Sequence, residues 1–288
     1  MSKNVYLKDL YLYGRENMKR HSIEKPALET SILLSKSSAI KNIAEIYSYP
    51  EKELDQTKVD EFNRLMERRI KNEPIAYITG EKEFYSRSFA VNSKVLIPRP
   101  ETELLIDEAL KAAWGIDRPA ILDIGTGSGC VAVTLACELN EAMICAADIS
   151  PAAAVVASEN AGRRIGTKYK INFICCSLID PFNADSFDIV VSNPPYISEA
   201  EFKALPPEIK EYEPRSALIA GEDGLHFIRE IISGAGNILK NGGWCILEIG
   251  AGQSSAVKTL FERAGFTEVS SAKDISDIER VIIARWRR

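Results

Sequence analysis

A four-residue turn in this chain suits chemistry on a planar nitrogen. Asn193-Pro194-Pro195-Tyr196 directly follows the strand-like run from Phe187 to Ser192. An amide or nucleobase amino nitrogen shares its lone pair with the adjacent π-system, which makes it a poor nucleophile. The Asn193 side-chain oxygen and the Pro194 carbonyl can accept its two N–H groups and turn the lone pair toward a methyl donor, while Tyr196 offers a face for stacking. We therefore predict methyl transfer to a planar nitrogen.

The two prolines make the turn rigid. Each proline fixes its own φ, and Pro194 also biases Asn193 away from the helical region. The acceptors are then preorganised before a substrate binds. Because Asn and Pro are common in turns, the tetrapeptide by itself also fits an ordinary strand end. Its position relative to a second motif favours the catalytic interpretation.

The second motif is a glycine-rich turn between a predicted strand and a predicted helix. The strand runs from Ala120 to Ile124, the turn from Gly125 to Gly129, and the helix from Val131 to Leu139. Glycines let the backbone approach a ligand closely, and the N-terminus of the following helix presents unpaired N–H groups. The pattern G-x-G-x-G alone also fits a structural turn. In this context it predicts a nucleotide site.

The next predicted strand, residues 142–147, ends at Asp148, where a carboxylate can accept both hydroxyls of a ribose. Ser150 is the expected cap of a helix that begins at Pro151. A dinucleotide and S-adenosylmethionine both fit such a site. The spacing is not G-x-G-x-x-G, no His or Lys is placed for hydride chemistry, and Asn-Pro-Pro-Tyr has no role in a dehydrogenase. We therefore predict S-adenosylmethionine as the cofactor.

The order of these motifs resembles that of the HemK-type protein-glutamine methyltransferases, which N(5)-methylate a glutamine of peptide chain release factors. The resemblance extends from about Glu73 to Ile283. It is carried by the motifs Glu73 to Gly80, Phe84-Tyr85, Val95 to Glu103, Asp123 to Gly129, Asp148 to Pro151, Asn193 to Tyr196, Tyr212 to Arg215 and Gly221 to Leu225.

This resemblance implies roles for individual residues. The target would be the glutamine in the Gly-Gly-Gln loop of class I release factors, and the process translation termination. The implied catalytic residues are Asn193, Pro194 and Tyr196, and the same turn with Pro195 would bind the target amide. The implied cofactor-binding residues are Asp123, Gly125, Thr126, Gly127, Ser128, Gly129, Asp148, Ile149, Leu178 and Asn193. No metal is expected.

Three segments leave alternatives open. The run from Ile97 to Glu103 resembles a turn beside the cofactor, but it also fits a capped helix start. Ser177-Leu178 stands where similar proteins often have an Asp before a large apolar residue, so a carboxylate contact to the adenine amino group is in doubt. Residues 273–280 replace the more usual Asp-x-x-Gly-x-x-Arg pattern, which predicts a loop of different shape before the last strand.

The elements that must position these motifs form an α/β protein. After residue 101, strands and helices alternate, as a Rossmann-like doubly wound sheet requires. The later strands are predicted at 170–175, 187–192, 243–249 and 279–285. Asn193 then lies at the carboxyl end of a central strand, on the same sheet edge as Gly125 and Asp148, where open α/β sheets bind ligands.

The chain before this sheet shows helical spacing. We predict a helical substrate-docking domain at 1–75, a β-hairpin linker at 76–100 and the methyltransferase domain at 101–288. The hairpin strands are expected at 82–84 and 88–91, followed by a strand-like run at 95–97. Helical spacing is carried by Leu7, Leu10 and Tyr11, by Leu28, Ile32 and Leu33, by a short helix at Asn42 to Tyr47, and by Val59, Phe62, Met66 and Arg69/Ile70. The helical domain could instead only cap the catalytic domain.

Composition limits the function classes. The 288 residues are 45% apolar, enough for about two domains. The net charge of −5 argues against a protein whose main task is to grip nucleic-acid phosphates. No signal peptide and no apolar run of about 20 residues is evident, so we expect a cytoplasmic protein without membrane contact. The alternative function is a nucleic-acid amino methyltransferase; a non-catalytic binding module is a third, less favoured interpretation.

The remaining titratable residues predict no further chemistry. The six cysteines lie in apolar settings without zinc-like spacing, so buried free thiols are expected at Cys130, Cys137, Cys145, Cys175, Cys176 and Cys245. The two histidines, His21 and His226, are not next to Asn193 and are expected to be structural or on the surface. No dedicated base is evident.

Overall fold

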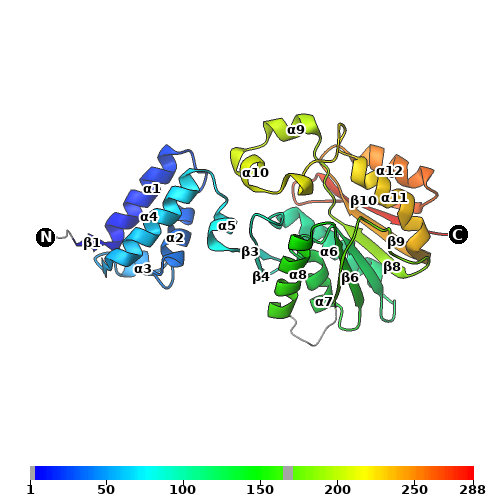
Figure 1. Ribbon diagram of the computed structural model, residues 1–288, viewed down its shortest axis with the longest axis horizontal. Coiled ribbons are helices and arrows are strands. Elements are labelled where there is room, and N and C mark those ends of the chain that lie inside the picture. Colours follow the sequence, from blue (N-terminus) through cyan, green and yellow to red (C-terminus); the bar gives the residue numbers. More distant parts are fainter. Residues whose placement is uncertain (1–3, 165–170) are drawn as a thin grey trace. The chain divides into compact units, whose positions relative to one another are not determined.

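The computed structural model describes residues 4–164 and 171–288, and it divides into two compact units (Figure 1). The helical unit comprises the described residues up to Gly80 together with Pro207–Tyr212, and the catalytic unit comprises the other described residues. The segment Pro207–Tyr212 follows the Asn-Pro-Pro-Tyr turn in sequence but belongs to the helical unit. The assignment of roles to 1–75, 76–100 and 101–288 stays a prediction.

The catalytic unit is built on a seven-stranded sheet with the order β10-β11-β9-β8-β5-β6-β7 (Figure 1). Strands β5 to β9 pair in parallel, and β11 is antiparallel to both of its neighbours. The strands are β5 (Ala120–Ile124), β6 (Met143–Asp148), β7 (Ile171–Cys175), β8 (Phe187–Ser192), β9 (Leu239–Glu248), β10 (Thr267–Lys273) and β11 (Glu279–Arg285).

Helices cover both faces of this sheet because successive strand residues point to opposite sides. Ile121 packs into the core shared with α6 (Glu103–Ala113), α7 (Cys130–Glu138) and α8 (Pro151–Arg164). Leu122 packs into the core shared with α11 (His226–Ile238) and α12 (Ser254–Arg263). The predicted doubly wound α/β fold is confirmed.

The carboxyl ends of β5 and β8 lie next to each other at the centre of the sheet. After β5 the chain adds β6 and β7 on one side and then returns to place β8 on the other. The Ser192 hydroxyl at the end of β8 donates to the Ile124 carbonyl at the end of β5, at 2.7 Å. The turns that follow these two strands therefore begin side by side, at the point where open α/β sheets bind ligands.

The hairpin strands are present as β3 (Glu81–Phe84) and β4 (Arg87–Ala90), which pair antiparallel. The expected strand at 95–97 is wrong. Asn92 begins a turn there, with its carbonyl accepting from the Val95 N–H at 3.1 Å. The Ile97 N–H donates to the Glu213 carboxylate at 3.1 Å and not to a neighbouring strand. A turn carbonyl and a side-chain carboxylate thus replace a strand ladder in this segment.

Strand β10 was not predicted from the sequence. Most of its residues are exposed or half-buried, since it lies at the edge of the sheet and lacks an apolar run. The predicted strands at 187–192 and 279–285 match β8 and β11, and β9 begins four residues earlier than expected. For the strand expected from Lys170, position 170 lies outside the described residues.

The loop of residues 274–278 joins β10 to β11 as a tight turn. The Asp274 carboxylate accepts the N–H groups of Ser276 at 2.8 Å and Ile278 at 3.1 Å. Its other oxygen accepts from Arg280 at 3.0 Å. One aspartate therefore shapes this loop.

The helical unit contains α1 (Leu7–Arg20), α2 (Pro26–Lys36), α3 (Glu45–Ser48), α4 (Gln56–Ile70) and α5 (Ile75–Thr79), with β1 (Val5–Tyr6) paired to β2 (Glu53–Leu54). The predicted short helix at 42–47 starts three residues later, as α3.

Two short helices follow the Asn-Pro-Pro-Tyr turn, namely α9 (Glu199–Ala204) and α10 (Pro207–Tyr212). The chain also forms two 3₁₀ turns, η1 (Pro100–Thr102) and η2 (Arg215–Ala217).

The buried face of α2 differs from the prediction. Leu28 is exposed, and the core-facing residues are Thr30, Ser31, Leu33 and Leu34. The Thr30 and Ser31 hydroxyls donate to carbonyls one turn earlier in the same helix, at 2.7 and 2.9 Å. Because their hydrogen bonds are satisfied locally, these hydroxyls can be buried where an apolar pattern would not place them.

All six cysteines are free thiols, as predicted, but they are not all buried. Cys130 and Cys245 are buried, whereas Cys175 is exposed at the end of the outer strand β7 and Cys176 lies just beyond it. Edge strands leave one flank uncovered, which explains the exposure. In the part of the chain that the structure describes, no helix combines the length and the apolar character that a bilayer crossing needs.

Candidate active site

A cavity of about 370 Å³ opens in the catalytic unit at the carboxyl ends of the central strands. It is lined by several predicted site residues, namely Gly125, Gly127, Asp148, Ile149, Leu178, Asn193 and Pro195. The other predicted residues do not line it: Asp123, Thr126, Ser128, Gly129, Pro194 and Tyr196. The structure thus brings both motifs to one site.

Two N–H groups of the glycine-rich turn donate to acceptors within the protein itself. The Gly125 N–H donates to the Ala147 carbonyl at 2.8 Å, and the Gly127 N–H donates to Asp148 Oδ2 at 2.9 Å. Both glycines have positive φ, +72° and +56°, a conformation that glycine adopts readily. A pyrophosphate would need these donors, so the turn fits a ligand without phosphates at this position.

Asp148 keeps acceptor capacity toward the cavity. Its Oδ2 accepts from Gly127, and its Oδ1 accepts from the Ser150 N–H at 2.8 Å. Each carboxylate oxygen has a second acceptor site. Among the described residues that line the cavity, Asp148 is the only carboxylate. It can therefore accept hydroxyl groups of a ribose.

The apolar side of the cavity is formed by Ile149, Leu178 and Phe227. Ile149 is exposed, which leaves its side chain available to a flat ligand. Ser177 also lines the cavity, so this position presents a hydroxyl and no carboxylate. A planar base would be held there mainly by apolar contact.

Asp123 lies buried beneath the glycine-rich turn. Its Oδ2 accepts from the Thr126 hydroxyl at 2.7 Å and from the Ala132 N–H at 3.2 Å. Its Oδ1 is buried without a hydrogen-bond partner among the described residues. Burial raises the pKa of Asp123 to about 7, and the Asp148 charge adds to that shift. A positively charged ligand near this carboxylate would stabilise its ionised form.

Gly129 and Ser128 hold the glycine-rich turn against α8. A Cβ on Gly129 would lie 3.0 Å from Ala157 of α8, so glycine permits the close approach of the turn to this helix. The Asn160 side chain, also in α8, donates to the Ser128 carbonyl at 2.8 Å and accepts from the Ala90 N–H at 2.7 Å. Sequence reasoning missed Asn160, although a polar Asn inside an Ala-rich helix is a usable signal, because Asn is unfavourable there.

The Asn193 amide is held in one orientation. Its Nδ2 donates to the Thr102 hydroxyl at 3.0 Å. With Nδ2 committed in this way, Oδ1 is the acceptor that remains for a substrate N–H. Thr102 ends the 3₁₀ turn η1, so the segment Ile97 to Glu103 is a helix start whose hydroxyl also reaches the site. Sequence reasoning did not assign Thr102 to the site.

Tyr196 is held by one side chain from the end of β9 and one from the N-cap of α12. Its hydroxyl donates to Glu248 Oε1 at 3.4 Å, and its carbonyl accepts from Gln253 Nε2 at 3.0 Å. Burial raises the pKa of Tyr196, so the hydroxyl stays protonated. Glycine at position 224 lets the chain pack closely against the Asn-Pro-Pro-Tyr turn, since a Cβ on Gly224 would clash with the Tyr196 carbonyl. No signal in the sequence identified Glu248 or Gln253.

An ion pair holds the cavity wall formed by residues 93–96. Arg99 pairs with Glu213, whose side chain is buried, and Glu213 also accepts from the Ile97 N–H. The two motifs that contain these residues are far apart in the sequence. Their pairing explains why both belong to the same site.

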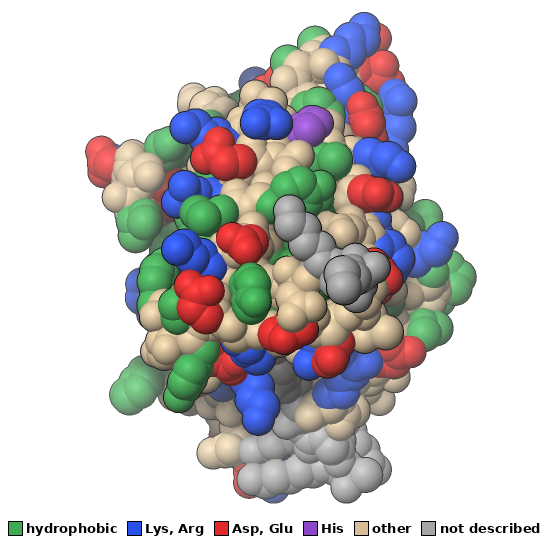
Figure 2. All heavy atoms as spheres, turned by 90° about the vertical axis from the view of Figure 1, so that its left-hand side faces the viewer, with side chains coloured by type: hydrophobic (Ala, Val, Ile, Leu, Met, Phe, Trp, Pro, Cys, Tyr) green, Lys and Arg blue, Asp and Glu red, His purple; other side chains and the backbone are tan. Residues whose placement is uncertain are grey.

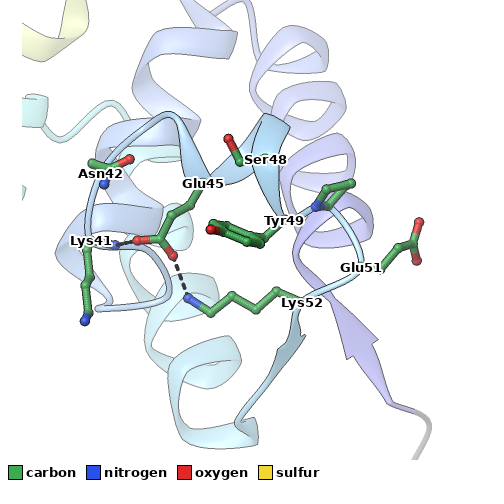
Figure 3. Close-up of a pocket in the computed structure, with 8 residues that line it drawn as sticks. Lys41, Asn42, Glu45, Ser48, Tyr49, Glu51 and Lys52 are labelled. Carbon is green, nitrogen blue, oxygen red and sulfur yellow. Dashed lines mark hydrogen bonds and ion pairs between the residues drawn. The ribbon is translucent and has the colours of Figure 1, made fainter.

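A second pocket, of about 830 Å³, lies in the helical unit and is lined by residues around α3. Figure 3 shows the Glu45 carboxylate accepting from the Lys41 N–H at 2.8 Å and from the Lys52 ammonium at 2.7 Å, with Tyr49 beside them. The Glu45 carboxylate therefore finds its hydrogen-bond donors within the pocket itself.

Neither His21 nor His226 lines the catalytic cavity. The described residues contain no group of three or more potential metal ligands.

Two family models match the chain. A model described as the PrmC N-terminal domain matches residues 9–80, and one described as the methyltransferase small domain matches residues 100–206. These ranges fall in the helical and catalytic units, respectively.

Curated relatives match nearly the whole chain. A release factor glutamine methyltransferase of Geobacter sulfurreducens is 40% identical over 95% of this chain and 94% of its own length. One of Nitratidesulfovibrio vulgaris is 38% identical over 99% and 96%. A bifunctional methyltransferase of Rickettsia typhi is 37% identical over 96% of this chain, which corresponds to 56% of that longer protein.

Solved structures share the fold at low identity. The hMettl16 catalytic domain has a TM-score of 0.55 at 18% identity, covering 69% of this chain and 74% of its own. A methyltransferase from Pyrococcus furiosus has a TM-score of 0.52 at 17% identity, covering 78% and 99%. At this identity the likeness concerns the fold alone.

Proposed function

We propose that this chain, which belongs to the family of release factor glutamine methyltransferases, methylates the side-chain amide nitrogen of the glutamine in the Gly-Gly-Gln loop of class I peptide chain release factors, with S-adenosylmethionine as donor. The observation that carries the proposal is the Asn193 amide, whose Nδ2 donates to Thr102, which leaves Oδ1 as the atom that would accept from a substrate N–H. An acceptor in that place suits an amide NH₂ group.

The residues present fit the donor. When bound, S-adenosylmethionine supplies an activated methyl group on a positively charged sulfur. Asp148 would hold the ribose, and Ile149 and Leu178 would hold the adenine. The buried Asp123 carboxylate, with one oxygen unpaired among the described residues, suits a cationic ligand. Because Gly127 donates to Asp148 and not into the cavity, a dinucleotide fits less well.

The chain's contribution to the reaction is mainly positioning. Asn193 Oδ1 and the Pro194 carbonyl would accept the two N–H groups of the target amide, and Tyr196 would support its plane. Well-oriented reactants can gain roughly 7–11 kcal/mol from such positioning. No histidine lines the cavity within the described residues. The proton lost by the amide nitrogen would leave either through Asn193 or to water after the methyl transfer.

Label transfer tests this proposal. Purified class I release factor, its variant with the Gly-Gly-Gln glutamine changed to alanine, bare DNA and bare RNA are incubated with the enzyme and methyl-labelled S-adenosylmethionine. We expect label on the intact factor only. Label on nucleic acid alone would replace the substrate assignment with a nucleic-acid amino methyltransferase, and no label on any substrate would favour a binding module.

We also propose that the helical unit docks the release factor, since a protein substrate requires contacts beyond one amide. Support comes from a set of exposed apolar side chains that we call the α3 patch, formed by Ile43, Tyr47 and Tyr49. Figure 2 looks onto the helical unit, where hydrophobic side chains lie among charged side chains of both signs. Aromatic residues are enriched at protein interfaces.

Changing Tyr47 and Tyr49 together to alanine tests the docking role. We expect the KM for release factor to rise about tenfold, because exposed aromatic anchors of this kind contribute more than 1 kcal/mol at interfaces. The affinity for S-adenosylhomocysteine should not change. Trp114→Ala, which removes an exposed aromatic from the catalytic unit, is the matched control. An unchanged KM for the double variant would leave the helical unit with a capping role only.

The proposed substrate also indicates the cellular location of the reaction. We propose that this chain acts in the cytoplasm, where a substrate that takes part in translation would be met. The net charge of −5 supports recognition of a protein without direct nucleic-acid binding.

A further inference from the structure

Tyr196, the last residue of the Asn-Pro-Pro-Tyr turn, is held at both of its ends by the connection between β9 and α12. Its hydroxyl donates to Glu248, the last residue of β9, at 3.4 Å. Its carbonyl accepts from the side chain of Gln253, the N-cap of α12, at 3.0 Å. One short stretch of chain therefore holds both the ring and the backbone of this tyrosine.

The Gln253 amide has hydrogen-bond partners on both of its polar atoms. Its Oε1 accepts from the Gly250 N–H at 2.9 Å. Its Nε2 donates to the Tyr196 carbonyl at 3.0 Å and to the Gly224 carbonyl at 3.5 Å. Because an N–H group lies on one side of the amide and carbonyls lie on the other, only one orientation of the amide satisfies these groups. Gln253 thus acts as a donor toward the turn.

Two glycines make room for this contact. A Cβ on Gly224 would clash with the Tyr196 carbonyl oxygen and would lie 2.8 Å from Gln253 Nε2. A Cβ on Gly250 would lie 3.1 Å from Gln253 Oε1 and 3.2 Å from the Tyr196 ring. The backbone on both sides of the Gln253 amide therefore approaches it more closely than a larger residue would permit.

The peptide unit between Tyr196 and Ile197 is fixed on both of its sides. Its oxygen is the Tyr196 carbonyl oxygen, which accepts from Gln253. Its N–H belongs to Ile197 and donates to the Leu218 carbonyl at 3.0 Å. A peptide unit is planar, so hydrogen bonds to its oxygen and to its N–H together fix its orientation. Without the Gln253 donor, one of these two restraints on the end of the turn is lost.

The two prolines link this restraint to Asn193. Pro194 and Pro195 each have a fixed φ, so few bond rotations separate Tyr196 from Asn193. A displacement of Tyr196 is therefore expected to displace the acceptors of the turn as well. In well-oriented reactions, a misplacement of about 1 Å can lower the rate roughly 100-fold.

We propose that Gln253 is a positioning residue for methyl transfer, because its side chain holds the Asn-Pro-Pro-Tyr turn in the geometry that receives the target amide. This inference rests on the proposed function, since that function places the target amide at this turn. Neither Gln253 nor Tyr196 lines the cavity. Loss of the contact is therefore expected to lower kcat and to leave the affinity for the cofactor unchanged.

Two substitutions separate the donor from the rest of the Gln253 side chain. Gln253→Met keeps the length of the side chain and removes the amide. Gln253→Glu keeps an acceptor for the Gly250 N–H, but an ionised carboxylate cannot donate to the Tyr196 carbonyl. We expect kcat for release factor methylation to fall about 10- to 100-fold in both variants. The dissociation constant of S-adenosylhomocysteine, measured by calorimetry, should equal that of the wild type.

The matched control is Gln56→Met, the same change at an exposed glutamine of the helical unit, and its kcat should equal that of the wild type. Thermal unfolding of each variant shows that kcat is measured on folded protein. A role in stability alone would lower the unfolding temperature and leave kcat unchanged at lower temperatures. Wild-type kcat in folded Gln253→Glu would therefore overturn the proposal.

Hydrogen exchange provides a readout without turnover. The Ile197 N–H belongs to the same peptide unit as the Tyr196 carbonyl, so it should exchange about tenfold faster in both Gln253 variants, as expected when one hydrogen bond that opposes local opening is lost. The N–H of Val190, which is buried in β8, should keep its wild-type rate. An Ile197 rate that is the same in the wild type and both variants would show that Gln253 does not restrain the turn.

The exchange rate also separates this inference from the proposed function. A wild type that transfers no methyl group to release factor overturns the proposed function, while the Ile197 rate still tests whether Gln253 restrains the turn. Faster exchange of Ile197 together with an unchanged kcat overturns the positioning role even if the wild type methylates release factor.

Discussion

Asn193→Ala is expected to lower kcat for release factor methylation by about 10²–10³-fold, the loss seen when a preorganised polar group is removed from a reacting centre. The alanine removes the Oδ1 acceptor that receives the target N–H, so the effect appears mainly in the transition state. The affinity for S-adenosylhomocysteine, measured by calorimetry, should change little, because Asp148, Ile149 and Leu178 still line the cavity.

Single-turnover kinetics with saturating cofactor would measure the chemical step directly. Asn183→Ala serves as the matched control, since Asn183 is an exposed asparagine of the same unit that does not line the cavity. A variant at position 193 with the turnover of the wild type would remove Asn193 from the mechanism.

Asp148→Ala is expected to weaken cofactor binding about 10- to 100-fold, since hydrogen bonds to a charged group contribute about 1.5–3 kcal/mol. Asp148 is the only carboxylate among the described residues that line the cavity, and both of its oxygens retain acceptor capacity for ribose hydroxyls. Calorimetric titration with S-adenosylhomocysteine gives the dissociation constant, and kcat at saturating cofactor should fall less than the affinity does.

Two controls are needed, because Asp148 also accepts from the Gly127 and Ser150 N–H groups. Thermal unfolding without ligand shows how much of the change reflects a loosened glycine-rich turn. Asp117→Ala removes one exposed carboxylate from the same unit without touching the cavity. If Asp148→Ala binds S-adenosylhomocysteine as the wild type does, the ribose assignment is wrong.

The order of the motifs carries most of the information about the reaction. Asn-Pro-Pro-Tyr follows β8 and the glycine-rich turn follows β5, and each is recognisable because its chemistry lies within a few consecutive residues. The strands that carry them can also be recognised in the sequence, because β5 and β8 are largely buried and most of their residues are apolar. The edge strand β10 is largely polar and gives no such signal.

The choice of ligand depended on contacts as well as on motifs. Glycine spacing favoured S-adenosylmethionine over a dinucleotide, but the structure supplies the physical reason. The Gly127 N–H is already bonded to Asp148, so it is not available to a phosphate. Which lone pairs and N–H groups remain free cannot be read from residue types, because it depends on the partner that each group finds in the fold.

The sequence by itself determined the α/β class, the position of the cofactor turn and the position of the target turn. These features depend on local patterns and on the rule that ligands bind at the carboxyl ends of parallel strands. Only the tertiary structure showed that Thr102 contacts Asn193 and that Glu248 contacts Tyr196. These residues come from η1 and β9, far from the turn in sequence. The hydrogen-bond partner of a buried side chain is set by the groups that meet in space, and a single sequence carries no local signal for that meeting.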